Sequence, residues 1–413
     1  MKELCVKKQD LSKKMKKFLQ KSPVLSDCVH KREQKIIIMS RQEDFLNIDG
    51  SVMEGGGQIL RMSVCLSALL RRPIRIAKIR GRRAKPGLQA QHLNGIRLVA
   101  DISGTDSVLN GAAKDSTEID FTPGENIGGG SYEADTKTAG STCLLAQASL
   151  PCLLFAGRES KLDLRGGTDA KMAPPVGYYV TVFRANLNKF GADFECDVAR
   201  RGYFPRGGGH LILTVPPVQS LNPVTMTEMG DVTKVTVTAS VAGSLPVKVA
   251  QEMAESAKEA LKRGGIPCGI TVEAYKEERA TGSGSSVWIV CETSTGCVLG
   301  GSACGSNKER PRLTGEAAAR ELLDSLEHRP CVDEHMQDQM VVLMALAGGK
   351  SRVRTGPLTL HTETAIHIAS TMSAAVFRVE KAEEGGGGDA VIIECDGIGL
   401  ENRGISASAS GDD

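Results

Sequence analysis

Hydrophobic and polar positions in the first part of the chain follow a strand–turn–helix order. Residues 45–49 alternate as a short strand does, and the glycines at 55–57 then interrupt the pattern. The apolar positions that follow recur with helical spacing as far as Leu70. The next elements predicted are a strand at 74–79, a basic turn at 81–87 and a helix at about 88–102.

The same order recurs twice further along the chain. In the second copy a strand ends at 132–135, a turn follows, and Ser141 is the predicted N-cap of a helix. Pro151 is expected to end that helix, which leaves 152–155 extended. The third copy runs from 340 to 361. Recurrence of this kind predicts duplicated α/β units.

The segment at 225–327 has a different pattern. Its predicted elements are a strand at 234–239, a helix at 249–261, strands at 270–275 and 286–292, and a helix at 314–326. Together they make a compact α/β pattern of roughly 100 residues, which we interpret as an inserted domain. The predicted division is therefore a basic extension at 1–44, a large domain at 45–224 and 328–400, the insert at 225–327 and a polar tail at 401–413.

Composition narrows the function classes. The 413 residues are 41% hydrophobic and carry a net charge of +2, so any attraction for polyanions must come from local clusters. Aromatic residues are only 4%, which argues against a platform that stacks long single strands. The 12 cysteines form no Cys-x-x-Cys pair, so we expect no structural zinc and a reducing compartment. No apolar run approaches the roughly 18 residues of a membrane span.

Paired lysines at 7–8, 13–14 and 16–17 make the first 44 residues basic. The stretch lacks the apolar core of a secretory signal. A solvated tail is the plainer interpretation, and a nuclear-targeting or RNA-contacting arm is the alternative. We expect the protein in the nucleus, in the nucleoplasm, with the cytoplasm as a second location.

His361 stands where an extended run at 353–360 is predicted to turn into a helix, with Thr362 or Thr364 as the N-cap. The free N–H groups and partial positive charge of a helix N-terminus favour phosphate oxygens and disfavour imidazolium. A neutral histidine there can attack a nucleotide phosphate and form a phosphoramidate. The alternative is a histidine that only hydrogen-bonds the turn.

Glu54 precedes three glycines at the predicted entrance of the first helix. Glycines let the backbone approach an anion, and the carboxylate can hold a divalent cation that bridges to it. Arg61, Arg80 and Arg83 cluster around this entrance, and guanidinium groups suit phosphate recognition. A tight turn with a solvated basic rim would use the same residues.

Two further groups have nucleotide or nucleic-acid chemistry. Residues 200–209 mix arginines, aromatic residues and glycines, which can stack a base and hold its phosphate, or form a surface hairpin. His335, Asp338 and Gln339 stand at i, i+3 and i+4 of a predicted helix. They can contact a purine and a ribose, or form a solvent-exposed face of the helix.

Taken together, these motifs resemble the RNA 3′-terminal phosphate cyclase family over about residues 44–400. The stretches that carry the resemblance are Gly50-Ser-Val-Met-Glu-Gly-Gly-Gly-Gln-Ile-Leu-Arg61, Lys85-Pro-Gly-Leu-Gln-Ala-Gln-His92, Asp135-Thr-Lys-Thr-Ala-Gly-Ser141, Arg201-Gly-Tyr-Phe-Pro-Arg-Gly-Gly-Gly209, Glu292-Thr-Ser-Thr-Gly-Cys297 and Leu360-His-Thr-Glu-Thr-Ala-Ile-His367. Their number and order make the resemblance specific.

The resemblance implies an α/β fold whose large domain has three repeated units, each like the C-terminal domain of translation initiation factor three, with a smaller inserted α/β domain. It also implies an ATP-dependent ligase in which His361 takes AMP from ATP and passes it to an RNA 3′-phosphate. The 2′-hydroxyl then attacks and gives a 2′,3′-cyclic phosphate. The implied cofactor besides ATP is Mg²⁺ or Mn²⁺. Neither a membrane nor an obligate protein partner is expected.

The family's functional residues can be carried over position by position. The metal-binding glutamate falls on Glu54, and the phosphate-binding arginines fall on Arg61, Arg80 and Arg83. The positions of the family's nucleotide contacts are Gln147, Pro174, His335, Asp338 and Gln339. Position 335 departs from the family, which usually carries tyrosine there, and imidazole offers adenine a smaller stacking surface.

Two other functions remain as alternatives. A non-catalytic relative acting as an assembly factor in ribosome biogenesis would share the fold but lack the active-site histidine. A metal-dependent RNA phosphohydrolase would need paired carboxylates or a His/Asp cluster for two metals. The presence of both His361 and Glu54 favours the cyclase.

Overall fold

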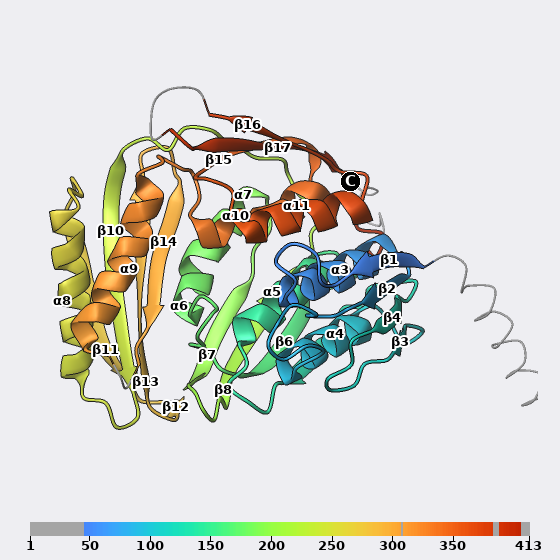
Figure 1. The fold of residues 1–413 in the computed structure, drawn as a ribbon, viewed down its shortest axis with the longest axis horizontal. Coiled ribbons are helices and arrows are strands. Elements are labelled where there is room, and N and C mark those ends of the chain that lie inside the picture. Colours follow the sequence, from blue (N-terminus) through green and yellow to red (C-terminus); the bar gives the residue numbers. More distant parts are fainter. Residues whose placement is uncertain (1–44, 307–308, 383–387, 406–413) are drawn as a thin grey trace, which may run out of the picture. The chain divides into compact units, whose positions relative to one another are not determined.

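The computed structural model describes residues 45–306, 309–382 and 388–405. The predictions for the basic extension and for 406–413 therefore lie outside the described residues. The chain divides into residues 1–46 and residues 47–413, and the second unit holds nearly all of the described residues. Its described residues form four sheets with helices packed on them, which confirms the predicted α/β class (Figure 1).

The first four elements of the first sheet follow the predicted order, and two strands that were not predicted, β3 and β4, complete it. The elements are β1 (Leu46–Asp49), α3 (Gly57–Leu70), β2 (Ile74–Ala77), α4 (Ala90–Ile102), β3 (Val108–Asn110) and β4 (Ile119–Thr122). The strand order is β1-β2-β4-β3. Arg71 ends α3 in the left-handed conformation, with φ at 54°, so the chain leaves the helix sharply before β2.

The second sheet has the order β12-β7-β8-β6-β5. Its elements are β5 (Ser131–Asp135), α5 (Thr142–Leu154), β6 (Ser160–Gly166), α6 (Val176–Tyr178), the π-helix η1 (Tyr179–Phe183), α7 (Arg184–Lys189), β7 (Glu195–Gly202), β8 (Gly209–Val215) and β12 (Ala280–Thr281). Ser141 is the N-cap of α5, as predicted, and its side chain accepts from the Leu144 N–H at 3.3 Å.

Pro151 lies inside α5, so the prediction of an extended stretch at 152–155 was wrong. Proline removes one helical hydrogen bond, but the rest of the turn still needs partners for its backbone groups. Leu150, Cys152, Leu153 and Leu154 are all buried, and the helix satisfies their backbone groups where no water can. Burial therefore outweighs the local preference of proline.

The third sheet has the order β16-β17-β15-β9. Its elements are β9 (Thr225–Met226), α10 (Glu334–Leu346), β15 (Gly348–Thr355), α11 (Leu360–Met372), β16 (Val376–Lys381) and β17 (Val391–Ile398).

The N-cap of α11 is Thr359, whose hydroxyl accepts from the Thr362 N–H at 3.1 Å. The prediction of Thr362 or Thr364 was wrong, because both are buried inside the helix and donate elsewhere. The preceding strand also ends earlier than predicted, at Thr355.

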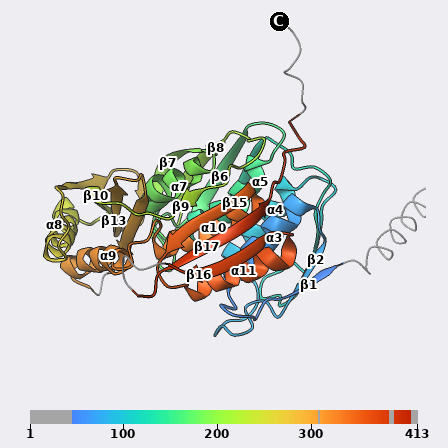
Figure 2. The ribbon, with the colours of Figure 1, turned by 90° about the horizontal axis from the view of Figure 1, so that it is seen from above.

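The fourth sheet, β11-β10-β13-β14, is built from the segment between 232 and 304. Its elements are β10 (Val232–Ala242), α8 (Val247–Arg263), β11 (Ile270–Glu277), β13 (Gly284–Thr293), β14 (Val298–Cys304) and α9 (Pro311–Leu326). Helices α8 and α9 pack on each other and on this sheet (Figure 2). Two short strands of the predicted insert at 225–327, β9 and β12, pair with β15 and β7 instead. The inserted domain and the threefold repeat remain predictions.

Four helices bring the predicted site residues together. Helix α10 packs on β15 and β17, α11 contacts both α10 and α3, and α3 contacts α5, which lies on β6 and β8. Figure 1 shows α10 and α11 between the sheet of β15 and the rest of the unit. Among the described residues, no helix combines the length and the apolar character that crossing a membrane requires.

Candidate active site

At the N-terminus of α3, the side chain of Glu54 forms a hydrogen bond with the backbone. The Glu54 carboxylate accepts from the Gly56 N–H at 2.6 Å and forms an ion pair with Arg83. A Cβ atom at Gly56 would collide with that carboxylate, and one at Gly57 would lie 2.5 Å from Nε2 of His92. A Cβ atom at either position would therefore force one of these side chains to move, whereas Gly55, with φ at 58°, has the left-handed conformation that favours glycine.

His361 lies in the first turn of α11, at a helix N-terminus as predicted. Its Nδ1 lies 2.9 Å from Oε1 of Gln58 on α3. Nε2 of Gln58 donates in turn to Oδ2 of Asp338 on α10 at 2.6 Å. Residues 303 and 280 positions apart in the sequence thus form one hydrogen-bonded chain.

The hydrogen bonds from Asp338 through Gln58 to His361 select the tautomer of the imidazole. The Asp338 carboxylate accepts the amide hydrogen of Gln58, so the carbonyl oxygen of Gln58 faces the imidazole. A carbonyl oxygen only accepts hydrogen bonds, so Nδ1 carries the proton and Nε2 keeps its lone pair. The imidazole, which is exposed, therefore offers an unprotonated nitrogen.

The surroundings of His361 also favour the neutral imidazole. Desolvation by the surrounding protein lowers the pKa of His361, and the cationic Arg61 and Arg83 lower it further, while Asp338 opposes them. Burial likewise raises the pKa of Asp338 against the opposing effects of His361 and Arg61. Burial lowers the pKa of Arg61 to about 10, so this guanidinium is still charged at neutral pH.

A cavity opens beside this hydrogen-bonded chain, between α3, α5, η1 and α10. Its polar lining includes Arg61, whose Nε donates to Oε1 of Gln147 at 3.0 Å. The residues that line it are Gln58, Arg61, Met62, Cys65, Gln147, Pro151, Phe183, Asp338, Gln339, Val342 and Leu343. Apolar walls with a few convergent polar groups are typical of a small-molecule site.

The structure brings most of the predicted residues to one place. Arg61, Gln147, Asp338 and Gln339 line the cavity. The hydrogen-bonded chain joins His361 to it. Glu54 and Arg83 meet at the entrance of α3, where the Glu54 N–H donates to the Thr364 hydroxyl on α11 at 3.2 Å.

Three predicted residues have other surroundings. Arg80 donates to the carbonyls of Lys85 and Gly87 in its own loop. Pro174 lies in the segment before α6. Neither these two nor His335 is among the described residues that line the cavity.

His335 interacts with α9, a helix that packs on the β11-β10-β13-β14 sheet. Its Nε2 lies 3.0 Å from Oε1 of Glu321 on α9, and its ring meets the edge of Tyr178 at 5.9 Å. Burial opposes the charged form, but Glu321 and neighbouring carboxylates prevail and raise the pKa of His335 to about 9. The imidazolium therefore takes part in an ion pair between α9 and α10.

Two polar residues of the site, Gln58 and His92, were not predicted from the sequence. Gln58 stands three residues before Arg61, and the helical spacing i, i+3, i+4, i+7 of Gln58, Arg61, Met62 and Cys65 could have shown the common face. Burial, with Arg80 and Arg61, lowers the pKa of His92 to about 4, so it is neutral beside the arginines.

The described residues contain no group of three or more metal-ligating side chains that could hold an ion. Glu54 is therefore a lone carboxylate, and its side chain is only 7% exposed. A lone carboxylate fits Mg²⁺, which usually takes one or two protein ligands and completes its shell with phosphates and water.

Comparison with known proteins gives a consistent result. A family model described as RNA 3′-terminal phosphate cyclase matches residues 52–379. An RNA 3′-terminal phosphate cyclase of Drosophila melanogaster is 40% identical over 363 residues, covering 87% of this chain and 99% of that protein. One from Pyrobaculum aerophilum is 39% identical, covering 86% of this chain and 99% of its own length. A probable cyclase of Dictyostelium discoideum is 36% identical, covering 93% and 89%.

Proposed function

Because the chain belongs to the RNA 3′-terminal phosphate cyclase family, we propose that it converts an RNA 3′-terminal phosphate into a 2′,3′-cyclic phosphate at the expense of ATP. Nε2 of His361 attacks the α-phosphorus of ATP and pyrophosphate leaves. The RNA 3′-phosphate then attacks the adenylated His361, and the AMP group passes to the RNA end. The vicinal 2′-hydroxyl finally attacks the RNA phosphate, which expels AMP and closes the ring.

The observation that carries this proposal is the hydrogen-bonded chain from Asp338 through Gln58 to His361. It leaves Nε2 unprotonated, and the lowered pKa keeps the ring neutral at neutral pH. A neutral, oriented imidazole is the form that can act as a nucleophile. Gln58 holds the Nδ1 proton throughout, so the attack needs no prior proton transfer from that nitrogen.

Cationic side chains already lie where the phosphates of ATP and of the RNA end would bind. Arg61 is half-buried in the cavity lining, and Arg83 reaches the entrance of α3. Preorganised cations of this kind lower the barrier of phosphoryl transfer, because they need no rearrangement as charge develops. The N-terminus of α3, with glycines at 56 and 57, adds backbone N–H groups that favour a phosphate.

The cavity suits a planar base. Met62, Phe183 and Leu343 contribute apolar surface, while Gln147 and Gln339 contribute amide groups for hydrogen bonds. We therefore assign the adenine of ATP to this cavity. Pro174 and His335 are proposed to contact the nucleotide from beyond the lining, as the family positions imply.

The experiment that tests the proposal uses ATP labelled at the α-phosphorus. Incubation of the full chain with this ATP and Mg²⁺ is expected to leave acid-labile label on the protein. Addition of 3′-phosphorylated RNA is expected to discharge that label as AMP and to yield cyclic-phosphate RNA. Absence of label under both Mg²⁺ and Mn²⁺ would contradict the proposed mechanism.

Glu54 is the residue that would hold a divalent metal, which when bound supplies charge neutralisation at the phosphates. The Glu54→Gln variant keeps an acceptor for the Gly56 N–H but loses the negative charge. We expect it to need roughly tenfold more Mg²⁺ for half-maximal labelling, a shift of about 1.4 kcal/mol. Its melting temperature should stay close to wild type, and Mg²⁺ titration of labelling together with thermal denaturation checks both. Unchanged metal dependence would remove Glu54 from this role.

His335→Tyr is expected to tighten ATP binding. Tyrosine cannot form the ion pair with Glu321, and its larger ring offers adenine more stacking surface, worth about 0.5–1.5 kcal/mol. Adenine would stay stacked in both ground and transition states, so the KM for ATP should fall a few-fold while kcat stays constant. ATP titration at saturating RNA measures this. Glu321→Gln, which releases His335 without adding a ring, is the matched control, and equal KM values would show that residue 335 does not meet the adenine.

A further inference from the structure

Phe204 is 79% exposed, and it is the only exposed aromatic side chain among the described residues. It lies in the loop 203–208 between β7 and β8. A large apolar ring usually packs into a core or an interface. Its neighbour Tyr203 is buried, so the loop turns one ring inward and leaves the next in water.

Hydrogen bonds hold this loop in place, so the exposure of Phe204 does not result from a loosely held loop. The Gly207 N–H donates to the Tyr203 carbonyl at 2.9 Å, and the Tyr203 N–H donates to the Thr281 carbonyl at 3.2 Å. The Thr281 hydroxyl donates to the Gly208 carbonyl at 3.1 Å. A Cβ atom at Gly207 would collide with the Thr138 carbonyl. The loop is thus clamped between β12 and the turn at 136–140.

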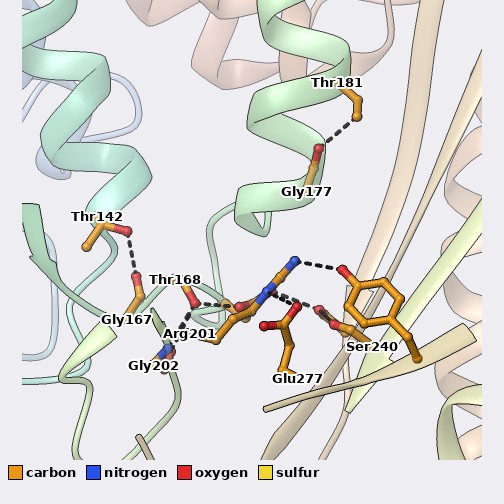
Figure 3. A network of polar contacts seen from close by, with 12 residues as sticks. Thr142, Gly167, Thr168, Gly177, Thr181, Arg201, Gly202, Ser240 and Glu277 are labelled. Atoms are coloured by element: carbon orange, nitrogen blue, oxygen red, sulfur yellow. Dashed lines mark hydrogen bonds and ion pairs between the residues drawn. The ribbon is translucent and has the colours of Figure 1, made fainter. Parts of the chain in front are cut away.

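A buried polar network anchors the strand that leads into this loop (Figure 3). Nη1 of Arg201 lies 2.9 Å from Oδ1 of Asp169, and its Nη2 donates to the Tyr275 hydroxyl at 3.2 Å. Ser286 donates to the same carboxylate oxygen at 2.8 Å. Because Tyr275 and Ser286 belong to β11 and β13, the network fixes the end of β7 against a second sheet.

The same end of the sheet carries an excess of positive charge. β5 and β6 run parallel and end there, β7 also ends there, and β8 begins there. The exposed basic side chains on the adjoining loops are Lys137, Lys171, Arg206 and Arg279. The carboxylates there are fewer: Asp135 pairs with Lys137 at 2.8 Å, Glu277 lies 3.7 Å from the buried Arg201, and Glu278 is exposed. A cationic surface with one exposed ring suits a single-stranded polyanion with bases.

A series of contacts links this surface to the entrance of the candidate active site. The ring of His92 lies against Gly57 at the entrance. The next residue back, Gln91, accepts from the Ser141 N–H at 2.8 Å, and Ser141 closes the turn at 136–140 that contacts the Phe204 loop. These contacts connect the entrance of α3, through α4 and the turn 136–140, to the Phe204 loop.

We propose that this sheet-end surface, made of the turn 136–140, the loop 203–208, Lys171 and Arg279, binds the RNA nucleotides upstream of the reacting 3′-phosphate. Phe204 stacks on a base, and the lysines and arginines contact backbone phosphates. Stacking and phosphate contacts do not read base identity, so the surface favours longer RNA without selecting sequence. The proposal rests on the RNA cyclase function proposed above.

The test compares RNA lengths in the full chain. For 3′-phosphorylated RNA of about twelve nucleotides, within the span that such grooves cover, Phe204→Ala is expected to raise the KM about fivefold or more. For a 3′-phosphorylated dinucleotide the same variant should match wild type. Phe204→Trp should restore tight binding. Arg206→Gln should lower the slope of log affinity against log salt by about 0.7. Lys262→Gln, which changes an exposed lysine on α8, is the matched charge control.

A second measurement separates this proposal from the proposed chemistry. Fluorescence anisotropy with 3′-hydroxyl RNA of the same length requires no adenylation, so it reports docking even if the protein cyclises nothing. Equal dissociation constants for wild type and Phe204→Ala would overturn the docking surface. An equal loss for the dinucleotide and the longer RNA would overturn it as well, because it would show a disturbed reaction site. If Phe204→Ala alters a protein complex but not RNA binding, the surface binds protein instead.

Discussion

His361→Ala protein is expected to lose covalent labelling by ATP entirely, and with it every detectable conversion of RNA 3′-phosphates. The variant removes the only nitrogen that the Asp338–Gln58 chain orients for attack, so no neighbouring group can accept AMP in its place. The helix should be preserved, because its N-cap is Thr359. Labelling with α-phosphorus-labelled ATP, followed by gel separation, measures the loss.

His367 provides the matched control on the same helix. It lies six residues after His361, about 240° further round, and it is also exposed. His367→Ala should therefore label at the wild-type level. Retained label on His361→Ala would show that another residue is the nucleophile, and loss of label in both variants would point to damage to α11 itself.

Asp169→Asn is expected to destabilise the fold by about 3–5 kcal/mol, the usual cost of breaking a buried ion pair from one side. The side chains of Asp169 and Arg201 are 0% and 5% exposed, and Asp169 also accepts from Ser286 and Thr168. The substitution leaves the Arg201 charge buried without its main partner. Urea denaturation followed by circular dichroism measures the change in the free energy of unfolding.

Two further variants identify the buried charge as the cause. Arg201→Met combined with Asp169→Asn should recover part of the lost stability, because no unpaired charge then remains inside. Arg312→Met breaks the ion pair with Glu259 on exposed helix surfaces, where water replaces the lost partner, and should leave the denaturation midpoint nearly unchanged. A wild-type midpoint for Asp169→Asn would mean that the network does not carry the contact between the sheets.

The elements and motifs followed largely from local pattern. Alternation and helical spacing located β1, α3, α4, β10 and α8 within a few residues, since the apolar positions recur with the period of each element. Ser141 was identified as an N-cap because its hydroxyl serves a neighbour three positions away. The glycines at 55–57 and the helix start near His361 were readable for the same reason, because short-range geometry demands them.

The errors occurred where burial competes with local preference. Pro151 stays inside α5 because its neighbours are buried, and an unwound backbone there would leave N–H and C=O groups without hydrogen-bond partners. Thr362 and Thr364 look like caps in the sequence, but tertiary packing turns them inward and gives the cap to Thr359. Neighbours that are distant in the sequence decide between burial and local preference. Those neighbours lie outside any short stretch of sequence.

The sequence by itself determined the α/β class, the family and the residue types that the proposed chemistry needs. The tertiary structure decided which of them meet. It placed Gln58 between His361 and Asp338, took His335 into an ion pair with Glu321, and joined two sheets through Arg201. The physical reason is range: propensity and capping act over a few residues, whereas hydrogen bonds and charges act through space between helices whose spacing only the packed core sets.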